Sequence, residues 1–240
     1  MTVAFEPGAI PTGGIHVGAF GFSNPEWLLE PLGRFRVETL ILLEMPGGDR
    51  ARARLNEKGI DVDHELARVV HHVEPRIVDL WNPGSVAAEL IRLADGLAAE
   101  GRGPAWVNIS TGPNPWCVAA NLAASFADMR VYHVDRGGHE IIHIPTIRQP
   151  RPTARELALL SLMPRDGAVV SGTLLKRMLR EQGFFRDSSS EKPAKNREQG
   201  QLNSALPRLL AWGAVLAGFH GSRRWYRLGP AGACLMSMFA

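Results

Sequence analysis

Short apolar runs alternate with longer amphipathic stretches from Ile15 to Ile144. The short runs are rich in β-branched and aromatic residues, which predicts strands, whereas the longer stretches repeat apolar residues at helical spacing. We expect strands over 15–20, 37–43, 76–81, 105–109, 130–135 and 139–144, and helices over 24–33, 48–58, 62–72, 84–100 and 114–127. This alternation predicts βα units around a mainly parallel, Rossmann-like sheet. The last two strands flank Arg136-Gly137-Gly138, a hairpin turn, so we expect an antiparallel edge.

The pattern changes after residue 148. Residues 148–153, RQPRPT, combine two prolines with polar neighbours and mark a domain boundary. Helical spacing returns over 154–163 and 171–183, and leucines on one face predict a third helix that begins near Leu202. Residues 215–229 predict two strands around a basic turn, and 229–239 a closing helix. This order is typical of a winged helix-turn-helix, while the polar run 188–200 predicts a flexible loop.

We therefore expect an α/β, Rossmann-like ligand-sensing domain over 1–148, a linker over 149–153 and a winged helix-turn-helix domain over 154–240. The charge changes at the same boundary. Residues 1–150 contain 13 Lys and Arg against 18 Asp and Glu, whereas residues 151–240 contain 14 against 6. A basic domain favours a polyanion such as double-stranded DNA; a solvated basic face on a protein–protein module is the alternative.

The stretch AWVNISTGPNPWCVAANLAASFA, residues 105–127, predicts a buried strand, a polar turn and a helix. Asn114 is the expected helix N-cap, followed by Pro115 at the first helical position. Backbone N–H groups and the helix dipole would then converge beside Ser110, Thr111 and Gly112, where an anion can bind. A plain strand-to-helix connection is the alternative.

The turn after the first strand is the second candidate ligand site. It contains Gly21, Phe22, Ser23 and Asn24, at the sheet edge where ligands bind in open α/β folds. Asn24 can equally cap the helix that begins near Pro25, and the two roles are compatible. The glycine spacing of a dinucleotide-binding turn is absent.

Catalytic and metal-binding patterns are weak. His139 and His143 fall four apart on one strand, about 13 Å between Cα atoms, which is too far for one ion. Neither a nucleophile elbow nor a pair of carboxylates beside a nucleophile stands out. We expect no metal, no cofactor and no catalytic residue. Two distant cysteines and the lack of a signal peptide or an apolar membrane span favour a cytoplasmic protein with no membrane contact.

Polar and basic side chains in the last domain are candidates for DNA contact. They lie on or before the third helix, off its leucine face, and at the hairpin turn. The set comprises Arg197, Gln201, Asn203, Ser204, Arg208, Arg223 and Arg224. Pro207 removes one helical hydrogen bond and is expected to bend this helix.

These features together resemble the CRISPR-associated Rossmann fold (CARF) transcriptional regulators that carry a C-terminal winged helix-turn-helix. NISTG at 108–112 and HVGAFGFSNPEWLLEPL at 16–32 are similar to the family's two ligand-binding motifs. The resemblance implies a homodimer that binds a cyclic oligoadenylate second messenger through Gly21, Phe22, Ser23, Asn24, Ser110, Thr111, Gly112 and Asn114, and promoter DNA through its winged helices.

The chain departs from the family at Pro113-Asn114, where a cationic residue is common. The resemblance implies a ligand-responsive regulator linked to CRISPR defence. A ring nuclease that cleaves the cyclic oligoadenylate is the alternative, although no general base is evident. Ala119, Ala120, Ala123 and Ala124 are small enough to let a helix of a second copy approach closely.

Overall fold

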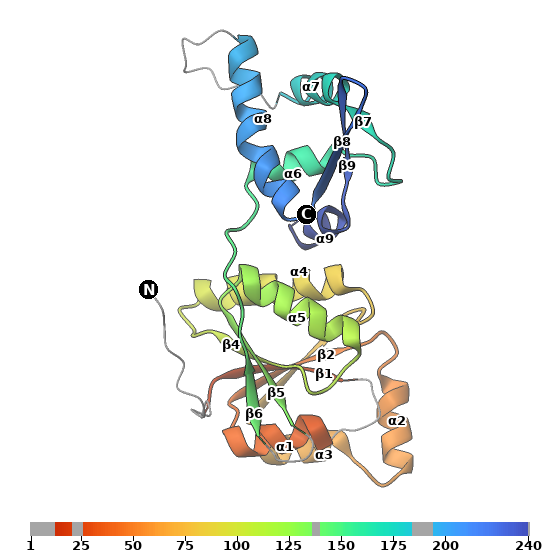
Figure 1. Cartoon of the computed structure of the whole chain (residues 1–240). Coiled ribbons are helices and arrows are strands. Elements are labelled where there is room, and N and C mark those ends of the chain that lie inside the picture. The colour runs from red at the N-terminus through yellow and green to blue at the C-terminus, as the bar shows by residue number, and fades with distance from the viewer. Residues whose placement is uncertain (1–12, 21–25, 136–139, 184–193, 240) are drawn as a thin grey trace. The chain divides into compact units, whose positions relative to one another are not determined.

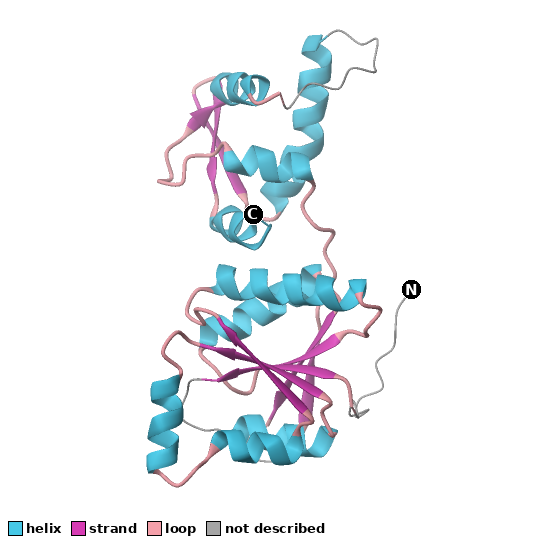
Figure 2. Ribbon diagram, turned by 180° about the vertical axis from the view of Figure 1, so that it is seen from behind, coloured by secondary structure: helices cyan, strands magenta, loops and turns pink. Residues whose placement is uncertain are grey.

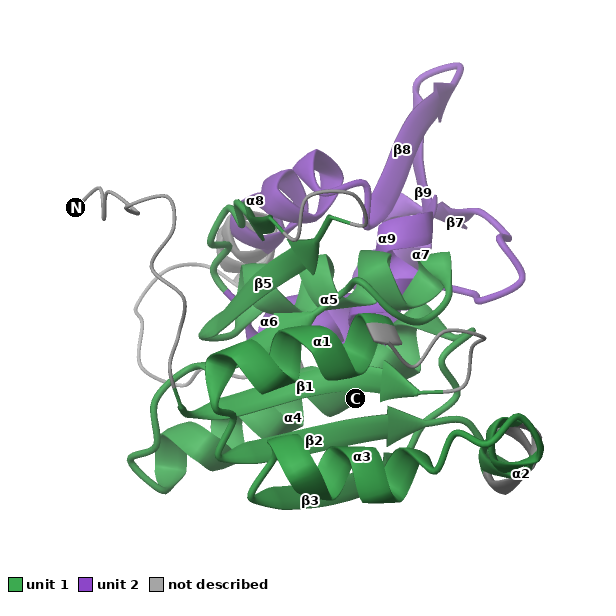
Figure 3. Ribbon diagram, turned by 90° about the horizontal axis from the view of Figure 1, so that it is seen from below, with its two compact units in different colours: residues 1–150 green, residues 151–240 purple. Residues whose placement is uncertain are grey.

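The computed structural model describes residues 13–20, 26–135, 140–183 and 194–239. The chain forms two compact units, residues 1–150 (unit 1) and 151–240 (unit 2). Figure 3 shows the two units in different colours.

Unit 1 has a mixed α/β fold built on a six-stranded sheet in the order β3-β2-β1-β4-β5-β6. The strands are β1 (Ile15–Phe20), β2 (Thr39–Glu44), β3 (His72–Ile77), β4 (Ala105–Asn108), β5 (Met129–Val134) and β6 (Ile141–Ile144). All neighbours pair in parallel except β5 and β6, which confirms the predicted antiparallel edge. The turn Arg136-Gly137-Gly138 lies outside the described residues.

Helices cover both faces of the sheet (Figure 1). Helices α1 (Glu26–Phe35) and α3 (Val62–Val69) lie on one face, while α4 (Pro83–Ala99) and α5 (Asn114–Phe126) lie on the other; α2 (Asp49–Glu57) lies beside the sheet. The sheet is the middle layer in Figure 2. β1 and β2 are buried along their full length, as expected for central strands with helices on both faces.

One predicted strand is displaced. We expected a strand over 76–81, whereas β3 spans His72–Ile77 and contains Pro75. A proline interrupts a sheet strand because it has no N–H to donate, which made this segment a poor candidate. β3 is an edge strand, however, so the missing N–H can face away from the sheet.

Unit 2 has the element order α-β-α-α-β-β-α. It contains α6 (Ala154–Ser161), β7 (Val170–Ser171), α7 (Gly172–Glu181), α8 (Ala194–Ala211), β8 (Val215–His220), β9 (Arg223–Leu228) and α9 (Pro230–Phe239). Its sheet is antiparallel, in the order β7-β9-β8. Leucines such as Leu159, Leu175 and Leu209 are fully buried and form the core between the helices.

The expectation of a flexible loop over 188–200 is wrong for residues 194–200, which belong to α8. This run contains Ala, Lys, Arg, Glu and Gln, all good helix formers, and it continues into the leucine-rich half of the helix. Polarity alone therefore misled the prediction. Helix α8 continues past Pro207, which lies inside it.

Candidate functional site

The order in which strands are added to the sheet changes direction between β1 and β4. β1 continues to β2 and β3 on one side, while β4 continues to β5 on the other, so β1 and β4 are neighbours whose following loops diverge. Open α/β sheets bind ligands in the crevice beyond the carboxyl ends of the strands at such a switch point. The predicted turns at 21–24 and 110–114 follow these two strands.

The turn after β4 is tied to both neighbouring strands. The Ser110 hydroxyl accepts a hydrogen bond from the Val134 amide of β5 (2.7 Å), and the Thr111 hydroxyl donates one to the Ala19 carbonyl of β1 (2.9 Å). The buried Asn108 side chain accepts from the Ser110 amide (2.8 Å). These bonds hold the turn in a fixed shape, so what it offers to a ligand is its backbone.

Gly112 allows the close packing that this turn needs. Its φ is +90°, a conformation that residues with a side chain rarely adopt. A Cβ added there would lie 2.8 Å from Cδ1 of the buried Trp116 and 3.0 Å from the Ala19 Cβ. Gly112 is therefore required by both backbone conformation and packing.

The expected helix cap is wrong by one residue. Pro113 occupies the N-cap, and the Trp116 amide donates to its carbonyl (2.9 Å), so the first turn of α5 begins at Pro113, one residue before Asn114. Asn114 is the first helical residue and its side chain is exposed. Among the residues that the structure describes, no side chain caps α5. The N-terminal end of α5 thus has the positive dipole without an internal carboxylate or hydroxyl against it.

The other candidate turn, Gly21, Phe22, Ser23 and Asn24, lies outside the described residues, so its role stays a prediction. On the β1 side of the candidate site, the last residues that the structure describes are Ala19 and Phe20. Arg52 of α2 lies over the Phe20 ring, 5.1 Å from its centre. The Arg52 guanidinium also pairs with Glu44 at the end of β2 and with Asp63. Sequence reasoning missed this cation, and its charge is already balanced by two carboxylates.

Two buried donors beside the turn were also missed. The Asn108 Nδ2 and Trp116 Nε1 atoms are buried and have no hydrogen-bond partner among the described residues. Because the Asn108 Oδ1 accepts from a backbone N–H, its amide orientation is fixed. Asn108 could have been found in the sequence, because it is a polar residue at the end of an otherwise apolar strand.

A buried histidine, His16, lies on β1 in the aromatic core of unit 1. The His16 ring stacks on Phe35, and its Nδ1 is 2.9 Å from the Tyr132 hydroxyl. Burial lowers the pKa of His16 to about 4. His16 is therefore neutral at pH 7 and belongs to the core.

The alanines of α5 pack within the protomer. Ala119, Ala120, Ala123 and Ala124 are fully buried, and α5 packs against α4. The expectation that these residues contact a second copy is therefore wrong: their small side chains allow the two helices of one protomer to approach closely.

The candidate DNA-contact residues of unit 2 divide into separate groups. Asn203 and Ser204 are exposed on α8, and Arg223 and Arg224 are exposed on the β8–β9 hairpin. The side chains of Arg197 and Gln201 lie outside what the structure describes.

Arg208 is held inside unit 2. Its Nε donates to the buried Glu156 carboxylate (2.7 Å), and its Nη2 donates to the Arg151 carbonyl (3.3 Å). Burial opposes the charge of Glu156, but hydrogen bonds from Arg208 and Thr153 lower its pKa. Arg208 thus joins α8 to α6 and to the segment before it.

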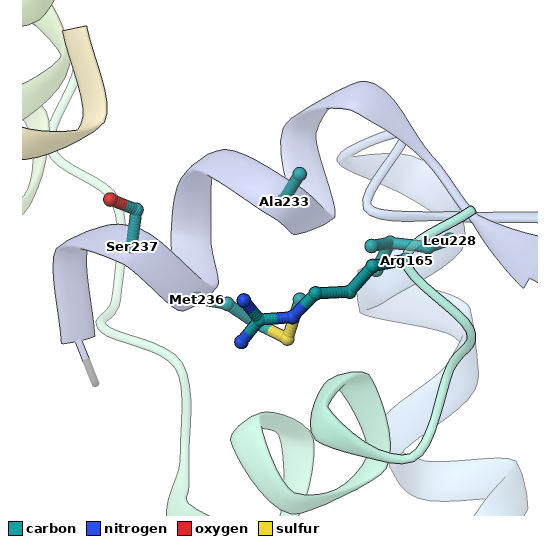
Figure 4. A pocket seen from close by; sticks show the side chains of 5 residues that line it. All are labelled: Arg165, Leu228, Ala233, Met236 and Ser237. Atoms are coloured by element: carbon teal, nitrogen blue, oxygen red, sulfur yellow. The ribbon is translucent and has the colours of Figure 1, made fainter. Parts of the chain in front are cut away.

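A mainly apolar cavity of about 320 Å³ lies in unit 2, beside α9. Its lining comprises Arg165, Leu228, Ala233, Met236 and Ser237 (Figure 4). Arg165 lies next to Met236 in this view, and the five lining residues contribute a single cation. Within the described ranges, no group of three or more His, Cys, Asp or Glu residues could hold a metal ion. The helices described there are also too short or too polar to cross a membrane.

The family profile described as "HFX_2341_N:-like, N-terminal" matches residues 14–137, just over half of the chain and most of unit 1. The chain belongs to this family. The match covers both strands of the switch point and both candidate turns. No curated protein matches the chain.

Several solved structures resemble this chain distantly. Protein VC1899 from Vibrio cholerae is 15% identical, with a TM-score of 0.43, and the match covers 94% of this chain and 64% of that one. Can2 from Sulfobacillus thermosulfidooxidans, solved with cyclic tetra-adenylate, is 13% identical with a TM-score of 0.43 and coverages of 93% and 61%. Csm6 from Enterococcus italicus, bound to a cyclic hexanucleotide analogue, is 11% identical with a TM-score of 0.40 and coverages of 83% and 56%.

The chain spans less than two thirds of the length of each of these proteins.

Proposed function

We propose that this protein is a ligand-responsive, DNA-binding transcriptional regulator that functions as a homodimer. Unit 1 is proposed to bind a cyclic oligoadenylate, as the CARF resemblance implies, and unit 2 to bind double-stranded DNA as a winged helix-turn-helix. The observation that carries the ligand proposal is the β1–β4 switch point with the uncapped N-terminus of α5 beside it.

Unit 2 supports the DNA proposal by its element order and its charge. Its order, α6-β7-α7-α8-β8-β9-α9, is the order of a winged helix-turn-helix with one further helix, in which α8 would be the recognition helix. Asn203 and Ser204 are exposed on α8. Unit 2 also contains 14 Lys and Arg against 6 Asp and Glu, which suits a polyanion.

The ligand proposal is tested by calorimetry of the full chain with cyclic tri-, tetra- and hexa-adenylate. Asn114→Asp places a negative charge in the first turn of α5, where the dipole favours it but a phosphate would be repelled. We expect this variant to fold normally and to lose affinity at least tenfold. Ser85→Asp is the matched control, because it adds the same charge to the first turn of α4, the helix that follows the edge strand β3.

Equal ligand affinity in Asn114→Asp and wild type would contradict a site at this turn. The same incubation separates the two classes of function. Linear products formed at catalytic turnover would favour the ring nuclease over the regulator. Light scattering at micromolar concentration tests the homodimer.

A further inference from the structure

Phe219 is the most exposed aromatic side chain in the part of the chain that the structure describes, at 70% exposure. Phe219 is the second-last residue of β8 and is followed by His220 and the turn of the β8–β9 hairpin. In Figure 3 this hairpin extends beyond the helices of unit 2. Burial of such a ring in a partner would remove a large apolar surface from water. We call Phe219, His220, Arg223 and Arg224 the hairpin tip.

Arg224 is held against this ring. The two residues are directly opposite in the register of β8 and β9, and the guanidinium lies 5.8 Å from the Phe219 ring centre. It also lies 5.3 Å from the ring of Tyr226, which is buried. Two aromatic rings therefore orient one cation at the surface by cation–π contacts.

The strand backbone beneath is also tightly packed. Trp225 lies opposite Gly218, and a Cβ at Gly218 would collide with the Trp225 ring. The aromatic ring and the cation thus belong to an ordered hairpin, which lowers the entropy lost when they contact a partner.

The charge around the tip indicates the kind of partner. Residues 215–228, which form the hairpin, contain three arginines and no Asp or Glu. An apolar ring beside an oriented guanidinium, with no nearby acid in the sequence, is complementary to a nucleic acid, because bases offer a stacking face and phosphates offer negative charge.

We propose that Phe219 inserts at a base step of duplex DNA in the minor groove while Arg224 contacts the adjacent phosphate. This inference rests on the proposed DNA binding by unit 2. Apolar side chains used in this way partly unstack the base step and bend the duplex. Phe219 would therefore contribute affinity and bending without contacting a phosphate.

The test compares full-length variants on a mixed-sequence duplex with a dye at each end. Fluorescence anisotropy gives the affinity as a function of salt, and energy transfer between the dyes gives the bend. We expect Phe219→Ala to lower affinity about tenfold, to reduce the bend and to leave the salt slope unchanged. Arg224→Ala should instead reduce the slope by about one.

Phe219→Tyr keeps the ring and should retain both affinity and bend. Val169→Ala is the matched control, because it truncates another exposed apolar side chain of unit 2, at 60% exposure. Wild-type protein that binds no duplex even at low salt would overturn the proposed function together with this inference. If wild-type protein binds the duplex and Phe219→Ala keeps the same affinity, or loses affinity without changing the bend, the proposal that Phe219 inserts is wrong while DNA binding by unit 2 stands.

Discussion

The turn after β4 and the hairpin tip of unit 2 carry their polar groups in opposite ways. Ser110 and Thr111 direct their hydroxyls to backbone partners inside unit 1, whereas Arg223 and Arg224 are exposed at the surface. The first arrangement leaves backbone amides and a helix dipole as the binding elements, and the second leaves side chains. Substitutions should therefore affect the first region mainly through folding and the second mainly through binding.

Gly112→Ala gives the largest expected effect and tests the first half of this contrast. The added Cβ meets Trp116 and Ala19 at a φ of +90°, so we expect the free energy of unfolding to fall by about 3–5 kcal/mol. Gly101→Ala is the control, because Gly101 also has a positive φ (+69°) but has open space around it. It should cost only about 1–2 kcal/mol. Equal losses in denaturant unfolding would show that packing at Gly112 is unimportant.

His16 should make the stability of unit 1 depend on pH. Its pKa is about 4 in the folded chain and near 6.5 when exposed, so the unfolded state takes up a proton first as the pH falls. The free energy of unfolding should therefore be greatest above pH 6.5 and fall by up to about 3 kcal/mol as the pH approaches 4.

Unfolding curves between pH 7 and pH 4 measure this loss. The double variant His16→Phe with Tyr132→Phe keeps the aromatic core and should remove the part of the slope that lies above the ordinary pKa of Glu. His64→Phe, at an exposed position of α3, should leave the slope in place. A slope that survives the double variant would assign it to another group.

The ion pair between Arg208 and Glu156 shows that Arg208, a candidate DNA-contact residue, also has a structural role within unit 2. Arg208→Ala leaves a buried carboxylate, and we expect it to lower the free energy of unfolding by about 2–3 kcal/mol at pH 7. Because the pKa of Glu156 is lowered, this contribution is present above the ordinary pKa of Glu and is lost as the pH falls through the lowered value.

Arg177→Ala is the matched control for that pair. Arg177 and Glu181 form an exposed ion pair on α7, worth at most about 0.5 kcal/mol. In a Glu156→Gln background, Arg208→Ala should cost less, since no buried charge remains. A loss no greater than that of Arg177→Ala would mean that the buried pair does not join α6 to α8.

The sequence predicted the sheet of unit 1 well because its strands are apolar and bounded by turns. β1 was placed correctly, as were both strands of the β8–β9 hairpin. β3 was displaced, since its proline is acceptable only at an edge, and strand order is a property of the whole sheet. The extra turns of α8 were missed because polar helix formers resemble a polar loop.

The candidate site was predictable in position but not in detail. Strand ends and turn residues located the 110–114 turn, and Gly112 follows from the need for a positive φ. The inward hydrogen bond of Thr111 and the ion pair of Arg208 depend on partners distant in sequence, Ala19 and Glu156. No local pattern reveals such partners.

The smallest expected effect concerns communication between the two regions, and it rests on the proposed function. The segment that joins the units is hydrogen-bonded at both ends. The Gln149 amide donates to the Ser125 carbonyl of unit 1 (2.7 Å), and the Arg151 carbonyl accepts from the Arg208 guanidinium of unit 2. Pro150 is the exposed residue between them, whereas Pro152 is buried. The restricted backbone of Pro150 can therefore transmit a ligand-induced change in unit 1 to the proposed DNA-binding unit.

Pro150→Gly should loosen this path and leave the packing around Pro152 intact. If ligand changes DNA affinity by the usual five- to 150-fold, DNA must change ligand affinity by the same factor. We expect Pro150→Gly to reduce that factor about threefold while the separate affinities stay within about twofold of wild type. Pro145→Gly, at another exposed proline within unit 1, is the control. Duplex affinity measured with and without saturating ligand gives the factor for each variant, and an undiminished factor in Pro150→Gly would show that the signal passes by another route than this linker.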